Sequence, residues 1–299
     1  MMFDWFRRIL SKEKKSEATA TVDADVNKVF FTAMTTKGNV RRINQDNLYV
    51  GESIQSAEDL VEFKCRGERA LPALFVVCDG MGGERDGDKA SEMAASEFLE
   101  LEESEGFSGL PEKTSEQVQA FFLEEIRKIS KKIYDTLGGR AGISGCTVTM
   151  LYLETRRFFM INVGDSPGFL LRGGKAELLT TPDNRAFQLY QLGVITEEER
   201  WTHRTKSQLT QFLGMDPDEM DLSPHIYEGV WKEEDQFVIG SDGLTDGLRT
   251  DAIYQMVDQV LDPENTICLA EELGNASLKN GSRDNVTAIT VRIKDQKKS

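Results

Sequence analysis

The sequence predicts a protein of the α+β class, in which antiparallel β-sheets are covered by α-helices. Three features predict it: short apolar runs follow one another with tight turns between them, helical patterns occur in pairs, and strands and helices do not alternate one for one as in a parallel sheet. The chain has 299 residues, of which 39% are hydrophobic and 29% charged. This balance is typical of a globular protein, and the length permits a large core without disulfide bonds.

We expect residues 1–27 to be a flexible leader and linker in front of the folded domain. The first ten residues are apolar and aromatic, three lysines follow, and 16–27 is small, polar and acidic. Two interpretations stay open. Residues 1–15 make a weak contact with a membrane or a partner protein as a short interfacial helix, or they are a frayed leader without a role.

Apolar runs bounded by turn residues predict the strands. A tight turn at Gly173-Gly174 and a polar connection at 154–157 indicate two hairpins. The expected strands are 29–36, 73–78, 146–153, 158–163, 169–172, 176–179, 236–240 and 286–293.

Apolar residues at helical spacing predict four helices, and we interpret their apolar stripes as core faces. The expected helices are 90–101, 118–137, 250–261 and 264–279. The stretch 182–224 is polar and mixed, with little strand character, which indicates an insertion or a lid.

The charge and the cysteines of the chain restrict its function and its location. Lysine and arginine number 36 and aspartate and glutamate 51, so the formal net charge is −15. A chain this acidic repels phosphate backbones, and we expect no nucleic-acid partner. Four scattered cysteines without a CxxC pair, and no secretory leader, predict a reducing, cytoplasmic compartment. No apolar run approaches the roughly 20 residues of a membrane span.

Five aspartates lie at the ends of apolar strands or in turns beside them, which indicates a metal site. A carboxylate at a buried strand end is costly to desolvate, and several that converge repel one another, unless a divalent cation compensates both effects. Oxygen ligands without His or Cys favour hard ions, Mg²⁺ or Mn²⁺. The five are Asp46, Asp79, Asp165, Asp242 and Asp284.

The motifs around these aspartates resemble, in order, those of the type 2C, metal-dependent Ser/Thr protein phosphatases, and they are most similar to bacterial members. The motifs are Arg41-Arg42-Ile43-Asn44-Gln45-Asp46, Val77-Cys78-Asp79-Gly80-Met81-Gly82-Gly83, Asn162-Val163-Gly164-Asp165-Ser166, Ser241-Asp242-Gly243-Leu244-Thr245-Asp246 and Asp284-Asn285-Val286-Thr287. The resemblance implies a four-layer α-β-β-α sandwich of two antiparallel sheets flanked by helix pairs. The phosphatase domain would occupy 28–299, with a flap subdomain at about 182–224.

The resemblance also implies a centre of two Mn²⁺ or Mg²⁺ ions at one edge of the sandwich. Asp79 would bridge both ions, and the carbonyl of Gly80 would ligate one of them. Asp242 and Asp284 would hold the other. Asp46 would lie near the cluster and act through bound water.

Further roles follow from the same resemblance. Asp165, together with Asp242, would correspond to a looser third-metal site. Arg41 would bind the substrate phosphate, for which its planar guanidinium is suited. Met81 stands where some relatives have a histidine and cannot titrate, so we expect a metal-bound water, steered by a nearby acid, to be the general acid.

The function implied is that of a protein serine/threonine phosphatase, which hydrolyses phosphoserine and phosphothreonine by direct attack of a metal-bridging hydroxide. Its partners would be phosphorylated proteins and a cognate Ser/Thr kinase. We expect a monomer, because no exposed heptad seam is evident. The alternative is a catalytically weak or inactive phosphatase-like module that binds or regulates other proteins.

Two other hydrolytic functions agree less well with the sequence. Gly164-Asp165-Ser166-Pro167-Gly168 matches the GxSxG pattern of serine hydrolases, but Pro167 has no backbone N–H for an oxyanion hole. A two-metal nuclease would also use several carboxylates, but the negative charge of the chain disfavours a nucleic-acid substrate.

Overall fold

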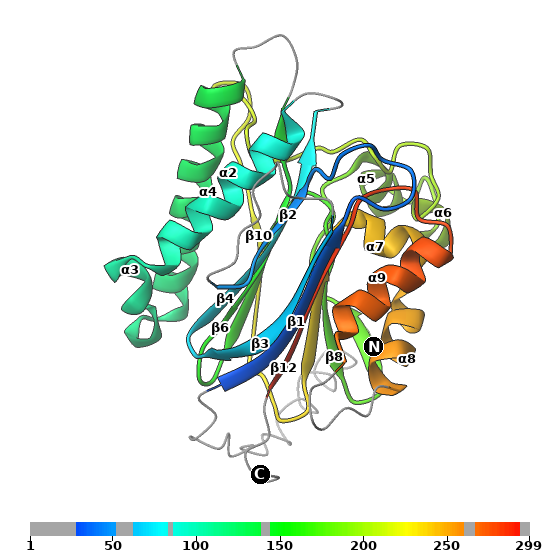
Figure 1. Ribbon diagram of the computed structural model, residues 1–299. Coiled ribbons are helices and arrows are strands. Elements are labelled where there is room, and N and C mark those ends of the chain that lie inside the picture. Colours follow the sequence, from blue (N-terminus) through cyan, green and yellow to red (C-terminus); the bar gives the residue numbers. More distant parts are fainter. Residues whose placement is uncertain (1–27, 52–61, 83–85, 139–143, 260–266, 294–299) are drawn as a thin grey trace, which may run out of the picture.

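The computed structural model describes residues 28–51, 62–82, 86–138, 144–259 and 267–293. These residues form two antiparallel sheets that lie face to face, with helices over the outer face of each (Figure 1). The order of layers is therefore helix, sheet, sheet, helix, which confirms the predicted four-layer sandwich. The predicted leader, 1–27, lies outside the described residues.

The first sheet has the strand order β3-β1-β12-β11-β8-β9. Its strands are β1 (Lys28–Thr36), β3 (Glu62–Ala70), β8 (Gly168–Arg172), β9 (Lys175–Leu178), β11 (Gln236–Gly240) and β12 (Val286–Ile293). β1 and β12 come from opposite ends of the chain and pair so that Thr35 lies opposite Thr287. The hydroxyl oxygens of these two threonines are 2.7 Å apart.

The second sheet has the strand order β10-β7-β6-β4-β2, and β5 also pairs with β4. Its strands are β2 (Asp46–Tyr49), β4 (Ala73–Met81), β5 (Gly145–Cys146), β6 (Val148–Leu153), β7 (Phe158–Val163) and β10 (His225–Gly229). The predicted strand 146–153 is divided at Thr147, whose N–H donates to the carbonyl of Asp79 at 2.8 Å. The Thr147 hydroxyl accepts from the Asp79 N–H at 3.1 Å. This interruption fixes the backbone of Asp79 near the end of β4.

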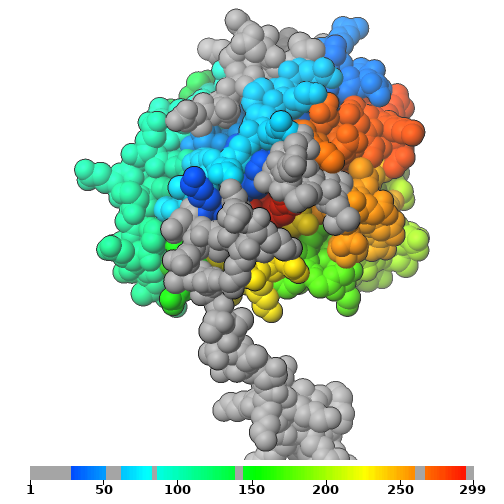
Figure 2. All heavy atoms as spheres, turned by 60° about the horizontal axis from the view of Figure 1, so that its bottom comes forward, coloured from blue at the N-terminus to red at the C-terminus, as the bar shows by residue number. Residues whose placement is uncertain are grey.

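Three strands, β2, β3 and β10, were not predicted from the sequence. All three are edge strands: β2 has only four residues, and β3 and β10 have exposed or half-buried side chains. Figure 2 shows the light-blue surface of β3 beside the orange surface of α9 (Leu269–Lys279). Apolar runs identify strands that are buried, so short or edge strands of polar composition escape this criterion.

The predicted helices are present, with shifted ends. They are α2 (Gly87–Glu102), α4 (Ser115–Leu137), α8 (Thr250–Gln259) and α9, which begins later than predicted. A capping box starts α4, since the Thr114 hydroxyl accepts from the N–H of Gln117 and the Gln117 side chain accepts from the N–H of Thr114. Short helical turns complete the described chain: α3 (Glu105–Ser108), η1 (Leu110–Glu112), α5 (Arg185–Gln191), α6 (Glu197–Arg200) and α7 (Asp242–Gly247).

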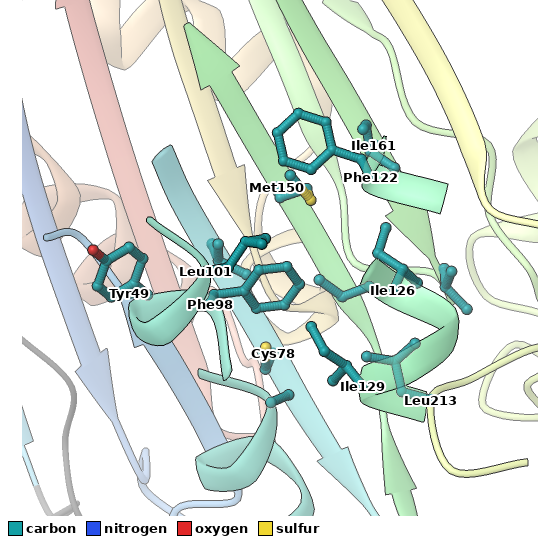
Figure 3. Packing of buried hydrophobic residues seen from close by; sticks show 14 of the residues in the cluster. Tyr49, Cys78, Phe98, Leu101, Phe122, Ile126, Ile129, Met150, Ile161 and Leu213 are labelled. Atoms are coloured by element: carbon teal, nitrogen blue, oxygen red, sulfur yellow. The ribbon is translucent and has the colours of Figure 1, made fainter. Parts of the chain in front are cut away.

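Apolar side chains fill the spaces between the four layers. Between the second sheet and its helices, Phe98 of α2 lies beside Ile126 of α4 and close to Met150 of β6 (Figure 3). Between the two sheets, Phe75 of β4 packs against Phe31 of β1, with ring centroids 5.6 Å apart. A third cluster joins the first sheet to α8 and α9. Among the described residues, no helix is both long enough and apolar enough to cross a membrane.

We predict that Phe75→Ala lowers the free energy of unfolding by about 3–5 kcal/mol, because it removes a fully buried ring from the layer between the sheets. Urea unfolding followed by circular dichroism measures the change. Leu192→Ala is the control, since this side chain is 73% exposed and should change stability by less than about 0.5 kcal/mol. Equal midpoints for Phe75→Ala and the wild type would contradict tight packing between the sheets.

Candidate metal centre

All five predicted aspartates lie at one edge of the sandwich. Asp79 lies near the end of β4, Asp165 follows β7, and Asp46 begins β2. Asp242 begins α7 just after β11, and Asp284 shortly precedes β12. Since neighbouring strands are antiparallel, the end of one lies beside the start of the next. Both sheets therefore present their acidic residues at the same edge.

Asp46 and Asp79 face each other across the β2–β4 ladder, where the register places them directly opposite. Side chains in this position have Cβ atoms about 4.5–5.5 Å apart. Burial raises the pKa of Asp79 most, and the neighbouring carboxyl group of Asp46 raises it further. Only 1% of Asp46 is exposed, so water does not relieve the repulsion between the pair.

Two hydroxyl groups of the first sheet hold Asp46. The hydroxyl of Ser241 donates to Asp46 Oδ2 at 2.7 Å, and that of Thr287 donates to the same oxygen at 2.8 Å. The Ser241 hydroxyl in turn accepts from the N–H of Thr287 at 3.0 Å. Because Asp46 belongs to the second sheet, these bonds join the two sheets at the acidic edge.

Gly243 brings the start of α7 against the turn before β12. A Cβ atom at this position would lie 1.9 Å from the carbonyl oxygen of Asn285, so no larger residue fits without a backbone shift. The close approach places Asp242, the residue before Gly243, near Asp284, and the two acidic groups interact electrostatically.

Gly80 allows a similar approach at the end of β4. A Cβ atom here would lie 2.2 Å from the carbonyl oxygen of Gly87 and 2.5 Å from that of Gln45. The Gly80 N–H donates to the Gln45 carbonyl at 3.0 Å. The predicted ligand Gly80 is thus held between the start of α2 and the residue that precedes Asp46.

Arg41 reaches the acidic edge from the loop after β1. Its Nη2 donates to Asp284 Oδ2 at 2.6 Å, while half of its side chain remains exposed. This hydrogen bond is the largest of the effects that raise the pKa of Arg41, and Asp242 and Asp79 add to it. The guanidinium therefore stays charged beside the aspartates and remains accessible from solvent.

Asn285 holds the loop that carries Arg41. Its Nδ2 donates to the carbonyls of Lys37 at 3.0 Å and Ile43 at 2.9 Å. Its Oδ1 accepts from the N–H of Gln45 at 2.9 Å. One buried side chain thus fixes the loop on both sides of Arg41.

Asp165 lies in a turn that Gly164 makes with a positive φ of 96°, a conformation that glycine adopts without strain. Asn184 Nδ2 donates to Asp165 Oδ2 at 2.9 Å. Lys206 also interacts electrostatically with Asp165. Asp165 is therefore linked to two residues of the 182–224 segment.

Burial is the largest cause of the high pKa values at this edge, and repulsion between neighbouring acids contributes. Burial raises the pKa of Asp46 to about 7, against the hydrogen bonds from Ser241 and Thr287, which lower it. Burial likewise raises the pKa of Asp165 to about 6. The pKa values of Asp79 and Asp242 lie well above the usual range, first through burial and then through nearby acidic groups.

The chemistry of this donor set fits hard divalent ions, because buried carboxylates that repel one another are stabilised by a cation with oxygen-ligand preference. As the side chains lie, however, no three Asp, Glu, His or Cys side chains of the described ranges are arranged to hold one ion. Asp46, Asp165 and Asp284 point to hydroxyl, amide and guanidinium partners instead. Ligation therefore requires these side chains to reorient on a backbone that already brings them together.

The structure bears in different ways on the other residues that the sequence analysis named. Ser166 is fully buried and its hydroxyl lies 2.7 Å from that of Thr147, so it cannot reach a substrate as a hydrolase nucleophile would. Met81 ends β4 at the same edge as Asp79. The metal-binding roles of the five aspartates and Gly80, and the phosphate-binding role of Arg41, stay predictions.

Sequence reasoning missed the residues that position this site. Ser241, Thr287 and Asn285 were part of the quoted motifs, but no role was predicted for them. Their polar side chains directly beside the acidic residues were the available signal. Lys206 was missed because it lies in the polar 182–224 segment, where a lysine is unremarkable in the sequence and only the fold shows its burial.

Comparison with known proteins identifies the relatives of this chain. The family model of protein phosphatase 2C matches residues 55–279. A protein from Streptococcus pyogenes serotype M6, named as being of the protein phosphatase 2C type, is 31% identical over 247 residues, which are 81% of this chain and 94% of that protein. The crystal structure of the serine/threonine phosphatase Stp1 from Staphylococcus aureus has a TM-score of 0.72 at 25% identity, over 90% of this chain and 96% of that chain.

A third comparison concerns the fold alone. The catalytic domain of the serine/threonine protein phosphatase PstP, in a crystal structure with two manganese ions, has a TM-score of 0.69 at 22% identity, over 90% of this chain and all of that chain. Full-length PstP of Mycobacterium tuberculosis is longer, and the match with this chain spans 45% of it.

The fold is that of the bacterial serine/threonine phosphatases. The chain belongs to the protein phosphatase 2C family, whose members depend on manganese or magnesium. This membership makes it a protein-serine/threonine phosphatase, as the motifs predicted.

We predict that Asn285→Ala lowers kcat/KM for para-nitrophenyl phosphate about tenfold, because the loop that carries Arg41 loses three hydrogen bonds. Steady-state kinetics with Mn²⁺ measure the change. Asn280→Ala is the matched control: this asparagine donates to the carbonyl of Gly247 on the exposed surface. An unchanged kcat/KM in Asn285→Ala would show that Asn285 does not position Arg41.

We predict that His225 stabilises the fold more at low pH than at high pH. Its Nε2 lies 2.8 Å from Asp183 Oδ1, and this hydrogen bond raises the pKa of His225 above the ordinary value of 6.5. Because the pKa is raised by folding, the stabilisation is complete below about 6.5 and is lost as pH rises through the folded-state pKa.

The loss of Tm in His225→Gln should therefore be larger at pH 6 than at pH 9, as measured by thermal unfolding. His203→Gln serves as control, since a ring nitrogen of His203 is hydrogen-bonded to the Thr205 hydroxyl at 2.8 Å. The same loss of Tm at both pH values in His225→Gln would contradict a charged His225–Asp183 pair.

Proposed function

We propose that this chain dephosphorylates phosphoserine and phosphothreonine in proteins with two Mn²⁺ or Mg²⁺ ions. Asp79, the carbonyl of Gly80, Asp242 and Asp284 would hold the ions, with Asp46 close by. The observation that carries the proposal is the convergence of buried, mutually repelling carboxylates from both sheets at one edge. Buried carboxylates that repel one another lower the stability of a fold, so a function such as ion binding explains their presence.

Divalent ions bound here would supply Lewis-acid activation of water, so that hydroxide attacks the phosphorus directly, and would offset the charge of the phosphate ester. The side chains of the chain supply orientation. Asp46 is held by the hydroxyls of Ser241 and Thr287, which keep its carboxyl group beside Asp79 until it turns towards an ion.

Arg41 is suited to bind the phosphate. Its guanidinium is charged, half exposed and beside the aspartates, and it offers further N–H donors in addition to the one that Asp284 accepts. A phosphate ester that approaches this edge meets a cluster of carboxyl groups, so a cationic side chain at the entrance favours its binding. Arg41 would therefore orient the phosphate towards the carboxylate cluster.

The proton for the leaving alkoxide does not come from Met81, which has no ionisable group. We propose that a water molecule activated by the ions, and steered by a nearby acid, supplies this proton.

The cellular setting is also a proposal. A cognate Ser/Thr kinase would supply the phosphoproteins, and the protein would act as a monomer, with 28–299 as its phosphatase domain and 182–224 as its flap. A cytoplasmic location is supported by four free cysteines, since reducing compartments keep thiols unpaired. The possible membrane or partner contact of residues 1–15 lies outside the described residues.

We predict that the purified chain hydrolyses para-nitrophenyl phosphate and a phosphothreonine peptide with Mn²⁺, and that EDTA abolishes both activities. Asp79→Asn should lower kcat by at least about 1000-fold, because it removes the charge of the proposed bridging ligand. Asp135→Asn, an exposed acid on α4, is the matched control and should keep full activity.

Activity that survives both chelation and Asp79→Asn would contradict the proposal. A wild-type protein that binds Mn²⁺ but hydrolyses neither substrate would support the alternative of an inactive phosphatase-like binding module.

A further inference from the structure

Lys206 lies among acidic groups of the candidate centre and not at the open surface. Only 17% of its side chain is exposed. Its ammonium forms an ion pair with Asp246 and interacts electrostatically with Asp242 and Asp165. The lysine comes from the 182–224 segment, whereas the three acids come from α7 and from the turn after β7.

Helix spacing on α7 and the neighbouring second sheet bring the three acids together around Lys206. Asp246 lies four residues after Asp242 on α7, so the two side chains share a helix face. Asp165 approaches from the second sheet. Lysine is ordinarily charged at neutral pH, and the ion pair with Asp246 holds the ammonium among these acids.

We propose that the ammonium of Lys206 is a built-in cation that takes the place of a third divalent ion at Asp165, Asp242 and Asp246. This inference rests on the proposed function, in which two ions lie nearer to Asp79. The sequence analysis left a third ion at Asp165 and Asp242 open. Lys206 compensates the charge there without a metal.

The space around Lys206 supports competition between the ammonium and an ion. Asp165, Lys206 and Thr245 line a cavity of about 20 Å³, which is room for about one water molecule. A divalent ion with its remaining water ligands needs more room than this. An ion at Asp165 could therefore bind only if the ammonium left, and at Asp246 the ammonium already occupies the carboxylate through its ion pair.

A different role for Lys206, as a second phosphate-binding residue, agrees less well with the structure. Its ammonium is already bonded to Asp246 and largely buried, whereas Arg41 is half exposed at the entrance. A covalently attached cation also has a constant occupancy, since neither dilution nor chelation removes it. The charge at Asp165 and Asp242 would then be compensated at every metal concentration.

The test is the number of Mn²⁺ ions bound by the full chain, measured by equilibrium dialysis and elemental analysis as free Mn²⁺ is raised. The wild type should saturate at about two ions and Lys206→Met at about three, because the freed carboxylates are hard oxygen ligands. Lys206→Arg keeps the charge and should stay at about two. Lys131→Met, which breaks an exposed ion pair with Asp135 on α4, is the matched control and should also stay at about two.

The position of the additional ion is tested with the double variant Lys206→Met, Asp246→Asn, which should return to about two ions. Lys206→Gln is measured alongside, because its amide can keep a hydrogen bond to Asp246 if the methionine variant does not fold. Equal ion numbers in the wild type and in the folded uncharged variants, whether two or three, overturn the proposal. Failure of the proposed function looks different: the wild type would then bind no Mn²⁺, or bind it unchanged after Asp79→Asn.

Discussion

Repulsion between buried carboxylates is the constraint on which the architecture of this protein's functional edge depends. Strands of two sheets end or begin there, and each brings an acidic residue to a place with little water. Burial and mutual repulsion raise the pKa values of Asp46, Asp79 and Asp242. The residues packed around the edge can be understood as the means by which the fold tolerates this charge.

The negative charges at this edge are compensated to different degrees, and these differences bear on function. Asp284 is paired with Arg41, and Asp46 accepts hydrogen bonds from two hydroxyls. Asp165 and Asp242 interact electrostatically with Lys206. Asp79 differs: burial raises its pKa first, and four neighbouring acidic groups raise it further. The position with the least compensation is the one at which a divalent cation gains the most electrostatic energy.

Much of the fold and part of the site could be predicted from the sequence, for identifiable physical reasons. Buried strands such as 158–163 are continuous apolar runs, and helix 118–137 has a regular apolar stripe, so both were recognised. The edge strand β3 has no such pattern, because its side chains alternate between exposed and half-buried positions. The aspartates were found because each follows or precedes an apolar strand. Asn285 and Lys206 act through contacts with residues far away in the chain, which no local pattern records.

Three parts of the structure, each held in a different way, meet at this edge. The strands fix the aspartates through ladders and through the apolar layer between the sheets, so the positions of the acidic residues change only if the core does. The loop that carries Arg41 depends on one side chain, Asn285. The 182–224 segment is joined to the acids by Lys206 and by Asn184. The backbone that carries the carboxylates is therefore fixed by the two sheets, whereas the cationic groups that face them come from two separate segments, the loop after β1 and 182–224. Arg41, which is half exposed, lies where a phosphate ester that is exchanged in every turnover would enter.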